Sequence, residues 1–600
     1  MEIKQKKREE IPNEFKWNLK DLYNSPEDWR KDVDSIPKLT EAITAFQGKL
    51  TSGKSLAECV KLYFTASEKS SNIYAYAMMK LHEDSNVSES QGISSIAEST
   101  DTKFSAATSF IVPEILAHDE KTILGFIVST PGLKPYEHFL KNLLRKKAHI
   151  RSAEVEEVLA NAVEVGNSSS NIYSMLDSAD MSFGKIKDAD GNAVEVTHGR
   201  FATLMQSPDR RVRMDAFKTY YSAYQALENT IATMFYSNIK NEMFNARTRN
   251  YSSTLEAALS SSNIPRAVYE ELINAVHEYL PTLHKYMALR KKALTLDELH
   301  MYDIYTPLVE EADIKITYQE AKKKVAEGLA ALGDEYVSAM VKGMESGWID
   351  VYENEGKESG AYALNVYGVH PYVLLNHEDT LSDMLTLAHE MGHAMHDYYT
   401  CENQPYHYGH PNVFLAEVAS TVNETLLLEH MINTTEDKKV RIFLLGEYLK
   451  QFRSTVFRQV MFAEFEMITH RMAESGEPLT LDTLKKIYRD LNVKYHGSDM
   501  IIDEEIDLEW ARIPHFYAAF YVYQYSTGYS AALAFAKKLQ TGDAQAREDY
   551  LGFLKAGGSD YAIEILKKAG VDMSTPEPVR AALQVFERLV AEMEEALCLK

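Results

Sequence analysis

Cysteine is scarce in this chain, which has three cysteines among 600 residues. Cys59, Cys401 and Cys598 are odd in number and far apart, so neither a disulfide framework nor a cysteine-based zinc site follows from them. Long apolar runs are also missing: no stretch approaches the ~18 residues of a membrane span, and the charged N-terminal segment lacks the apolar core of a secretory signal. Free thiols are typical of a reducing compartment, so we expect a cytoplasmic protein without a membrane partner.

A surplus of positive charge is missing as well. The formal net charge is −24 and the pI is near 5.3, whereas nucleic-acid binding needs a basic surface. We therefore expect no nucleic-acid partner. The hydrophobic content of 45% and the charged content of 25% are ordinary for a soluble globular protein, and 600 residues exceed what one compact core organises.

Proline and glycine are few, at 17 and 27 residues, which favours long helices joined by short loops. Apolar residues recur three and four positions apart through much of the chain, which is the period of amphipathic helices. Clear examples are Ile264–Leu280, Tyr318–Leu332 and Val579–Met593. The sequence therefore predicts a mostly α-helical fold.

Two segments break this helical pattern and predict strands. Met181–Val196 alternates around Asp188–Asn192, which is a hairpin turn signal. Gly360–Asn376 is rich in Tyr, Val and Leu. We expect a boundary near residue 200, so that residues 1–200 form a helical lobe ending in the hairpin and residues 201–600 form a second domain.

A His-Glu-x-x-His motif at His389–His393 lies inside Leu381–Tyr399, a segment that reads as one helix capped by Thr380. Residues four apart lie on one helical face, so the two histidines can bind one metal ion. Glu390 can then accept a proton from water held by the metal, which is the chemistry of a zinc peptidase. The pattern also arises by chance, so the residues around it decide its meaning.

A catalytic zinc site has three protein ligands and one open position. The class with an extended Gly and His pattern is excluded, because His396 and Tyr399 stand where that Gly and that His would be. The next apolar helix, Val413–Met431, offers Glu417 and Glu424 on one face. Glu417 is the expected third ligand, because a carboxylate among apolar neighbours needs a partner such as a metal ion.

Other residues near the motif are expected to support the ligands. Glu424 would orient a ligand histidine through the second ring nitrogen of that histidine; the alternative is an exposed helix charge. His396 is expected behind the ligands or facing substrate, with an ordinary polar helix residue as the alternative. Glu402 and Glu429 are less favoured as ligands because of their positions along the helices.

Tyrosines gather near the C-terminus, after His515. Tyr521, Tyr525 and Tyr529 are four residues apart and are expected along one side of a helix. Tyrosine hydroxyls and an imidazole suit the donors that stabilise the oxyanion of peptide hydrolysis. Core packing is the alternative for an aromatic stripe, but so many hydroxyls beside a histidine favour the wall of an active site.

The chain contains four motifs in this order: GAYALNVYGVHPYVLLN (360–376), LAHEMGHAMH (387–396), FLAEVASTVNE (414–424) and RIPHFYAAFYVYQYSTG (512–528). Together they resemble oligoendopeptidase F, within the thimet-oligopeptidase family of zinc peptidases. The segments at 245–259 and 302–308 are also similar to that family, so the resemblance spans nearly the whole chain.

This resemblance implies a large, mostly α-helical, two-lobed metallopeptidase with a deep substrate channel and a small β element beside the zinc helix. It implies one Zn²⁺ held by His389, His393 and Glu417, with Glu390 as the general base. Cobalt and manganese are alternative metals, although two histidines and a glutamate fit zinc best.

The resemblance also implies that a histidine and tyrosines of the C-terminal motif bind substrate and the oxyanion. His515, Tyr521 and Tyr525 are the expected catalytic donors. Tyr517 and Tyr529 are expected to contact substrate, with Tyr523 as a further alternative.

An extended peptide can pair with an exposed strand edge, main chain to main chain. The candidates for that edge are Gly360, Ala361, Tyr362 and Gly368, because glycine lets another backbone approach closely. The sequence thus predicts a zinc endopeptidase of short unfolded oligopeptides. The alternatives are an exopeptidase and a catalytically inactive peptide-binding protein of the same fold, either as a monomer or as a homo-oligomer.

Overall fold

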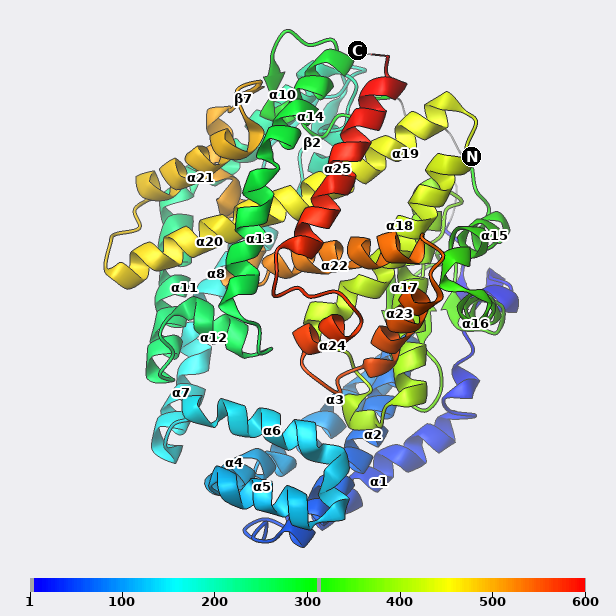
Figure 1. Cartoon of the computed structure of the whole chain (residues 1–600), viewed down its shortest axis with the longest axis vertical. Helices are drawn as coiled ribbons and strands as arrows, with labels where there is room; N and C mark the ends of the chain where they lie inside the picture. The colour runs from blue at the N-terminus through cyan, green and yellow to red at the C-terminus, as the bar shows by residue number, and fades with distance from the viewer. Residues whose placement is uncertain (1–4, 310–314, 599–600) are drawn as a thin grey trace. The chain divides into compact units, whose positions relative to one another are not determined.

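The computed structural model describes residues 5–309 and 315–598, most of which are helical, as Figure 1 shows. The predicted mostly α-helical fold with a few short strands is confirmed. The chain divides into two compact units: Met1–Ala148, Ile314–Leu427 and Phe535–Gly570 form the first, and His149–Asp313, Leu428–Ala534 and Val571–Lys600 form the second. The boundary expected near residue 200 stays a prediction; residues 149–313 run through that position as part of one unit.

The N-terminal part of the first unit packs helices around an apolar core. The long helix α2 lies against α1 and α3, and the core extends to Tyr372 and Leu374 of a strand more than 200 residues further along the chain. The helices are α1 (Pro26–Thr44), α2 (Gly53–Glu83), α3 (Ser88–Thr108), α4 (Ile111–Ala117), α5 (Glu120–Ser129) and α6 (Glu137–Lys146).

A small sheet follows in the same unit, formed by β4 (Ile349–Asp350), β5 (Tyr362–Leu364) and β6 (Tyr372–Leu374). The central strand β6 is parallel to β4 and antiparallel to β5. The strands predicted within Gly360–Asn376 are therefore confirmed. Among the described residues, β5 pairs on one side only, so its other side is an open strand edge.

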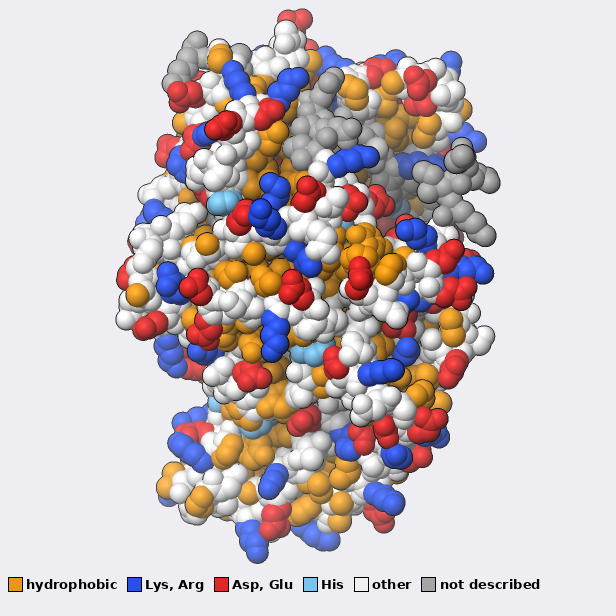
Figure 2. Space-filling view, turned by 90° about the vertical axis from the view of Figure 1, so that its right-hand side faces the viewer, with side chains coloured by type: hydrophobic (Ala, Val, Ile, Leu, Met, Phe, Trp, Pro, Cys, Tyr) orange, Lys and Arg blue, Asp and Glu red, His pale blue; other side chains and the backbone are white. Residues whose placement is uncertain are grey.

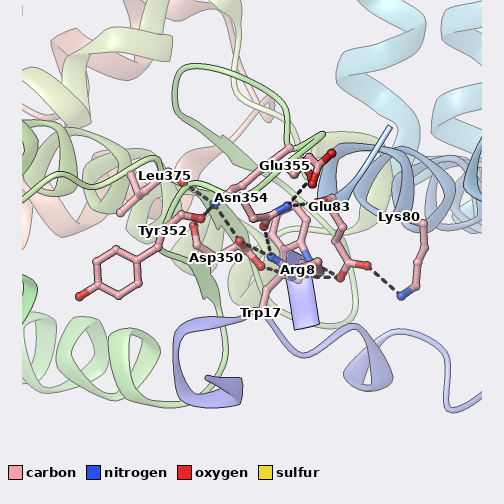
Figure 3. Close-up of polar contacts among 10 residues, drawn as sticks. Arg8, Trp17, Lys80, Glu83, Asp350, Tyr352, Asn354, Glu355 and Leu375 are labelled. Carbon is pink, nitrogen blue, oxygen red and sulfur yellow. Dashed lines mark hydrogen bonds and ion pairs between the residues drawn. The ribbon is translucent and has the colours of Figure 1, made fainter. Parts of the chain in front are cut away.

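Buried charges fix this sheet to the N-terminal segment, as Figure 3 shows. Arg8 donates to both carboxylate oxygens of Asp350 in β4. Lys357 lies 2.8 Å from the same carboxylate and donates to the carbonyl oxygen of Leu375 just beyond β6. The side chains of Asp350 and Lys357 are fully buried, where an unpaired charge would be strongly destabilising. The network thereby fixes the positions of β4 and β6, and β5 pairs with β6.

The His-Glu-x-x-His motif lies on α17 (Leu381–Asn403), which begins with the predicted capping pair. Thr380 Oγ1 accepts from the backbone of Asp383, and the carboxylate of Asp383 accepts from the backbone of Thr380. The predicted end at Tyr399 is wrong by four residues. The helix continues because Thr400 remains buried and donates to the carbonyl oxygen of Leu554 in α23 (Ala544–Ala556).

Three further helices of the first unit pack against α17: α15 (Tyr318–Gly328), α16 (Asp334–Glu345) and α23 (Ala544–Ala556). The second ligand helix begins at Ala416 rather than at the predicted Val413, because Val413–Leu415 forms a turn of 3-10 helix. The complete set of remaining described helices in the first unit is α15, α16, α18 (Ala416–Thr434, which ends in the second unit), α23 and α24 (Ala562–Lys568).

The second unit contains the predicted hairpin, formed by β1 (Lys185–Lys187) and β2 (Ala193–Glu195). Asp188 accepts the backbone N–H groups of Asp190 and Asn192 in its turn. A second pair, β3 (Leu299–His300) and β7 (Met500–Ile501), is parallel. The helices are α7 (Ala153–Gly166), α8 (Ser168–Met175), α9 (His198–Leu204), α10 (Arg210–Ala226), α11 (Glu228–Thr248), α12 (Thr254–Ser260), α13 (Arg266–Glu278), α14 (Leu280–Ala293), α19 (Lys438–Gln451), α20 (Arg458–Ser475), α21 (Leu481–His496), α22 (Tyr523–Leu539) and α25 (Glu577–Ala596).

The surface mixes charges of both signs. On the face drawn in Figure 2, acidic and basic side chains are interspersed with apolar ones. None of the described helices has the length and apolar character that crossing a membrane requires.

Candidate active site

Two neighbouring helices of the first unit bring three potential metal ligands together. His389 Nε2 and His393 Nε2 on α17 lie 3.2 Å apart. Glu417 Oε2, in the first turn of α18, lies 3.4 Å from the first of these nitrogens and 3.5 Å from the second. The three ligand atoms thus form a nearly equilateral triangle.

This triangle fits a zinc ion. Zn–N and Zn–O bonds of about 2.0–2.1 Å in a tetrahedral site place neighbouring ligand atoms about 3.3–3.4 Å apart. Among the described residues, these three form the group of His, Cys, Asp or Glu side chains that could hold a metal ion. The residues present therefore match the ligand number and the spacing of a zinc site with one open position.

Glu424 lies seven residues, or about two helical turns, after Glu417 and contacts the other ring nitrogen of His389. The Nδ1 atom of His389 hydrogen-bonds to the carboxylate of Glu424, which leaves Nε2 directed at the ligand triangle. Burial by itself lowers the pKa of His389, but the carboxylates of Glu417 and Glu424 raise it to about 10. The metal-free imidazole is therefore protonated at neutral pH, and a metal ion must displace that proton.

The two ligand helices approach so closely because α17 has a glycine at the contact. A Cβ atom on Gly392 would lie 2.5 Å from Ser420 Cα and 2.7 Å from the carbonyl oxygen of Ala419. Nearby, Asn423 of α18 donates to the carbonyl oxygen of Ala388 at 3.1 Å. The spacing of the ligands thus depends on direct backbone packing between α17 and α18.

Glu390 faces the cavity beside the ligands. The cavity has a volume of about 350 Å³, and its walls include the strand edge at Ala361–Ala363, the motif histidines and Glu417. Burial raises the pKa of Glu390, against the influence of the two neighbouring histidines. A carboxyl group with a raised pKa, beside a place for metal-held water, is suited to accept a proton.

The expected C-terminal cluster forms within the second unit. The hydroxyl of Tyr525 and His515 Nε2 lie 3.3 Å apart, and the ring of Tyr521 is centred 6.2 Å from that of His515 and 5.5 Å from that of Tyr525. Burial lowers the pKa of His515, and Arg458 lowers it further. The cluster therefore presents a neutral imidazole and two tyrosine hydroxyls.

The prediction that Tyr521, Tyr525 and Tyr529 lie along one helix is wrong for Tyr521. Tyr521 precedes α22, which begins at Tyr523, so the chain between His515 and Tyr521 sets the position of Tyr521. Tyr529 lies on the helix but is buried against Phe452, with ring centres 5.1 Å apart.

The backbone before Tyr521 is held by a buried glutamate. Phe520 has a left-handed conformation with φ of +54°, and its N–H donates to Glu466 Oε1 at 2.8 Å. Glu466 is fully buried and its Oε2 has no hydrogen-bond partner among the described residues. Burial raises the pKa of Glu466 strongly, and its Oε1 atom fixes the strained turn at Phe520.

Known proteins resemble this chain over most of its length. Residues 203–585 match Peptidase family M3. The chain belongs to peptidase family M3. Residues 114–183 match a second family described as Oligopeptidase F.

Curated relatives of this M3 peptidase match almost its whole length. It is 46% identical to oligopeptidase PepF of Bacillus subtilis, over 98% of this chain and 88% of the relative. It is 41% identical to the group B oligopeptidase PepB of Streptococcus agalactiae, over 98% of each chain.

Solved structures support the same assignment. The crystal structure of oligoendopeptidase-F from Enterococcus faecium has a TM-score of 0.74 and 37% identity, and the match covers 96% of this chain and 99% of that one. The chain is therefore a peptidase of a metal-dependent family, and its substrates are peptides.

Only some of the remaining residues expected at the site line the ligand cavity of this M3 peptidase. Ala361 and Tyr362 line the cavity beside the ligands, whereas Gly360 lines a neighbouring one. Gly368 lines neither of these cavities. His396 lines the ligand cavity but is 2% exposed, and burial lowers its pKa to about 3, so it is a neutral imidazole packed on Phe553.

Other expected positions are as follows. Tyr517 stacks on Tyr173 at 4.4 Å, and Tyr523 is buried against Tyr269. Glu429 pairs with Arg588 in the second unit.

The loop after α17 is tied down on both sides. Tyr406 hydrogen-bonds to Ser71 at 2.6 Å, and the backbone of Phe139 donates to the hydroxyl of Tyr408. Within this loop only Pro411 is among the residues that line the ligand cavity.

Asp397 is a site residue that sequence reasoning missed in this M3 peptidase. It lines the ligand cavity one helical turn after His393 and accepts from Asn365 Nδ2 at 3.0 Å. Burial raises the pKa of Asp397 to about 7, against the effects of His393 and Asn365. Its four-residue spacing from His393 was the available signal.

Proposed function

We propose that this M3 peptidase is a zinc-dependent endopeptidase that hydrolyses internal bonds of short, unfolded oligopeptides. The observation that supports zinc is the ligand triangle of His389, His393 and Glu417, with atoms 3.2–3.5 Å apart. Two imidazoles and one carboxylate favour zinc over magnesium or calcium, which prefer oxygen ligands alone.

Each residue near the triangle has a proposed role. A zinc ion held by His389, His393 and Glu417 would make its bound water more acidic and would polarise the scissile carbonyl. Glu390 accepts the proton of the attacking water and passes it to the leaving amine. Glu424 holds His389 in the orientation needed for binding. The open edge of β5 hydrogen-bonds to the main chain of the substrate, which gives affinity without demanding a particular sequence.

We assign the oxyanion donors to the second unit. His515, Tyr521 and Tyr525 present an imidazole and two hydroxyls in one cluster. Donors of this kind lower the barrier when charge develops on the carbonyl oxygen. Tyr517 is proposed as a further substrate contact, whereas Tyr529 is buried and packs against Phe452.

The test uses an internally quenched peptide, with and without a chelator. Glu390→Gln should retain bound zinc and lose about 10²–10⁴-fold in kcat, the usual contribution of a general base. Glu417→Ala should lose most of its zinc. Glu402→Gln, an exposed change at the end of the same helix as Glu390, is the matched control and should behave as wild type.

Two results would contradict the proposal. Substantial turnover by Glu390→Gln would remove the general-base assignment, and normal zinc content in Glu417→Ala would move the third ligand elsewhere. Mass spectrometry of the products of a mid-length peptide separates the endopeptidase from the exopeptidase alternative, because only an endopeptidase cleaves bonds away from both ends of the peptide. The cytoplasmic location expected from the sequence stays a prediction, as does the choice between monomer and homo-oligomer.

A further inference from the structure

A second large cavity lies within the second unit, beside the chain that joins His515 to Tyr521. Its volume is about 590 Å³, which is within the range of about 300–1,000 Å³ typical of ligand pockets. Tyr517, Ala518 and Ala519 form one wall. Asparagines from two helices form much of the rest: Asn167, Asn171, Asn238, Asn241 and Asn245.

Helical geometry explains why these asparagines share one space. Asn238, Asn241 and Asn245 are three and four residues apart on α11, so their side chains lie on one face. Asn167 and Asn171 are four apart at the start of α8, and α8 packs against α11. The two faces meet across the cavity.

The charged side chains of the lining are hydrogen-bonded to partners within the protein. Glu242 accepts from Asn238 at 2.8 Å and pairs with His470 at 2.7 Å. Arg249 donates to both carboxylate oxygens of Glu156, at 2.9 and 3.0 Å. The groups left to meet a ligand are therefore mainly uncharged carboxamides.

A carboxamide has two N–H donors and one carbonyl acceptor, the same kinds of group as the peptide unit. The side chains of Asn167 and Asn171 make no hydrogen bond with any described residue, so their donors and acceptors are available in the cavity. Such a wall can bind the main chain of an extended peptide and exerts little selection on its side chains.

We propose that this cavity is a distal subsite, which binds the main chain of a peptide substrate beyond the residues that flank the cleaved bond. This inference rests on the proposed function, because its wall at Tyr517–Ala519 connects two residues assigned to the scissile carbonyl, His515 and Tyr521. Its consequence is a dependence on substrate length: a peptide long enough to reach the asparagines gains affinity that a shorter one lacks.

The experiment uses two series of internally quenched peptides with one scissile core, uncharged polar extensions and increasing length. One series is extended only towards the N-terminus and the other only towards the C-terminus. The variant Asn171→Leu removes one free carboxamide, and Asn171→Gln restores it. Asn229→Leu, an exposed change at the start of α11 outside the cavity, is the control.

In Asn171→Leu we expect KM to rise by about threefold to tenfold, the range for one lost hydrogen bond. The rise should affect only long peptides of one series, with kcat and the shortest peptides unchanged. Asn171→Gln should recover most of the affinity, and Asn229→Leu should match wild type. A rise at every length in both series, or at no length, would overturn the inference.

Failure of the proposed function gives a different result. If wild-type protein cleaves none of the peptides, catalysis as proposed is wrong, and the cavity is then tested by calorimetric titration with the longest uncharged peptide of each series. Weaker binding to Asn171→Leu than to Asn229→Leu would support the subsite, and equal binding would overturn it.

Discussion

Gly392 sets the distance between the helices that carry the proposed ligands, and Gly392→Ala tests that role. The added methyl group would lie 2.5 Å from Ser420 Cα and 2.8 Å from Ser420 N. Carbon atoms in contact normally lie about 3.5–4.0 Å apart, so the helices must separate by about 1 Å at this point. The atoms that the methyl group meets belong to the backbone, so no side-chain rotation can relieve the contact.

Two effects on stability oppose each other in this variant. Alanine stabilises a helix interior by about 0.8–1 kcal/mol relative to glycine, whereas overpacking costs about 1–3 kcal/mol. The free energy of unfolding should therefore fall by no more than about 2 kcal/mol. Metal binding should suffer more, because a shift of about 1 Å greatly exceeds the ~0.2 Å tolerance of metal–ligand distances.

We expect the zinc affinity of Gly392→Ala to fall at least about tenfold, as happens when groups that orient metal ligands are removed. The assay is competition with a chromophoric chelator, together with thermal unfolding in the presence and absence of zinc. Gly552→Ala is the matched control, because a Cβ on this α23 glycine meets no atom within 4 Å. Wild-type zinc affinity in Gly392→Ala would refute the argument that backbone packing at this glycine sets the ligand spacing.

Three further predictions concern buried acids and protons. Glu424→Gln should weaken zinc binding by about 10–100-fold with the fold intact, as equilibrium dialysis can measure, because His389 loses its charged partner. The carboxylate partners of His389 raise its pKa to about 10, so zinc binding at neutral pH should release about one proton, and zinc affinity should rise with pH up to about 10. Calorimetry in buffers of different ionisation enthalpy measures this proton release. A finding of no release would contradict the prediction. Glu466→Leu should lower the free energy of unfolding by about 1–3 kcal/mol, because the buried N–H of Phe520 loses its acceptor, whereas Glu466→Gln, which keeps an acceptor, should lose less in the same denaturant titration.

Features that depend on neighbouring residues were predictable from the sequence. The helical spacing of His389 and His393, the cap at Thr380 and the hairpin around Asp188 are all confirmed, since each depends on residues within a few positions. The amphipathic segments Ile264–Leu280 and Val579–Met593 also form helices, as α13 and α25.

Boundaries were less predictable because packing decides them. The helix of the motif extends beyond Tyr399 because Thr400 finds an acceptor on α23, far along the chain. Tyr521 lies before its predicted helix, in a turn held by Glu466. The sequence around Thr400 does not indicate its acceptor on α23, and the sequence around Tyr521 does not indicate the contact with Glu466.

The sequence by itself determined that His389 and His393 could share a metal ion, because a helix fixes the relation of these two residues without any other part of the fold. Only the tertiary structure decided how close Glu417 comes to them, through the backbone contact at Gly392. Tertiary packing also placed the half-buried Asp397 beside the proposed ligands and brought the asparagines of α8 and α11 around one cavity. These distances depend on contacts between segments far apart in sequence, which no local period encodes.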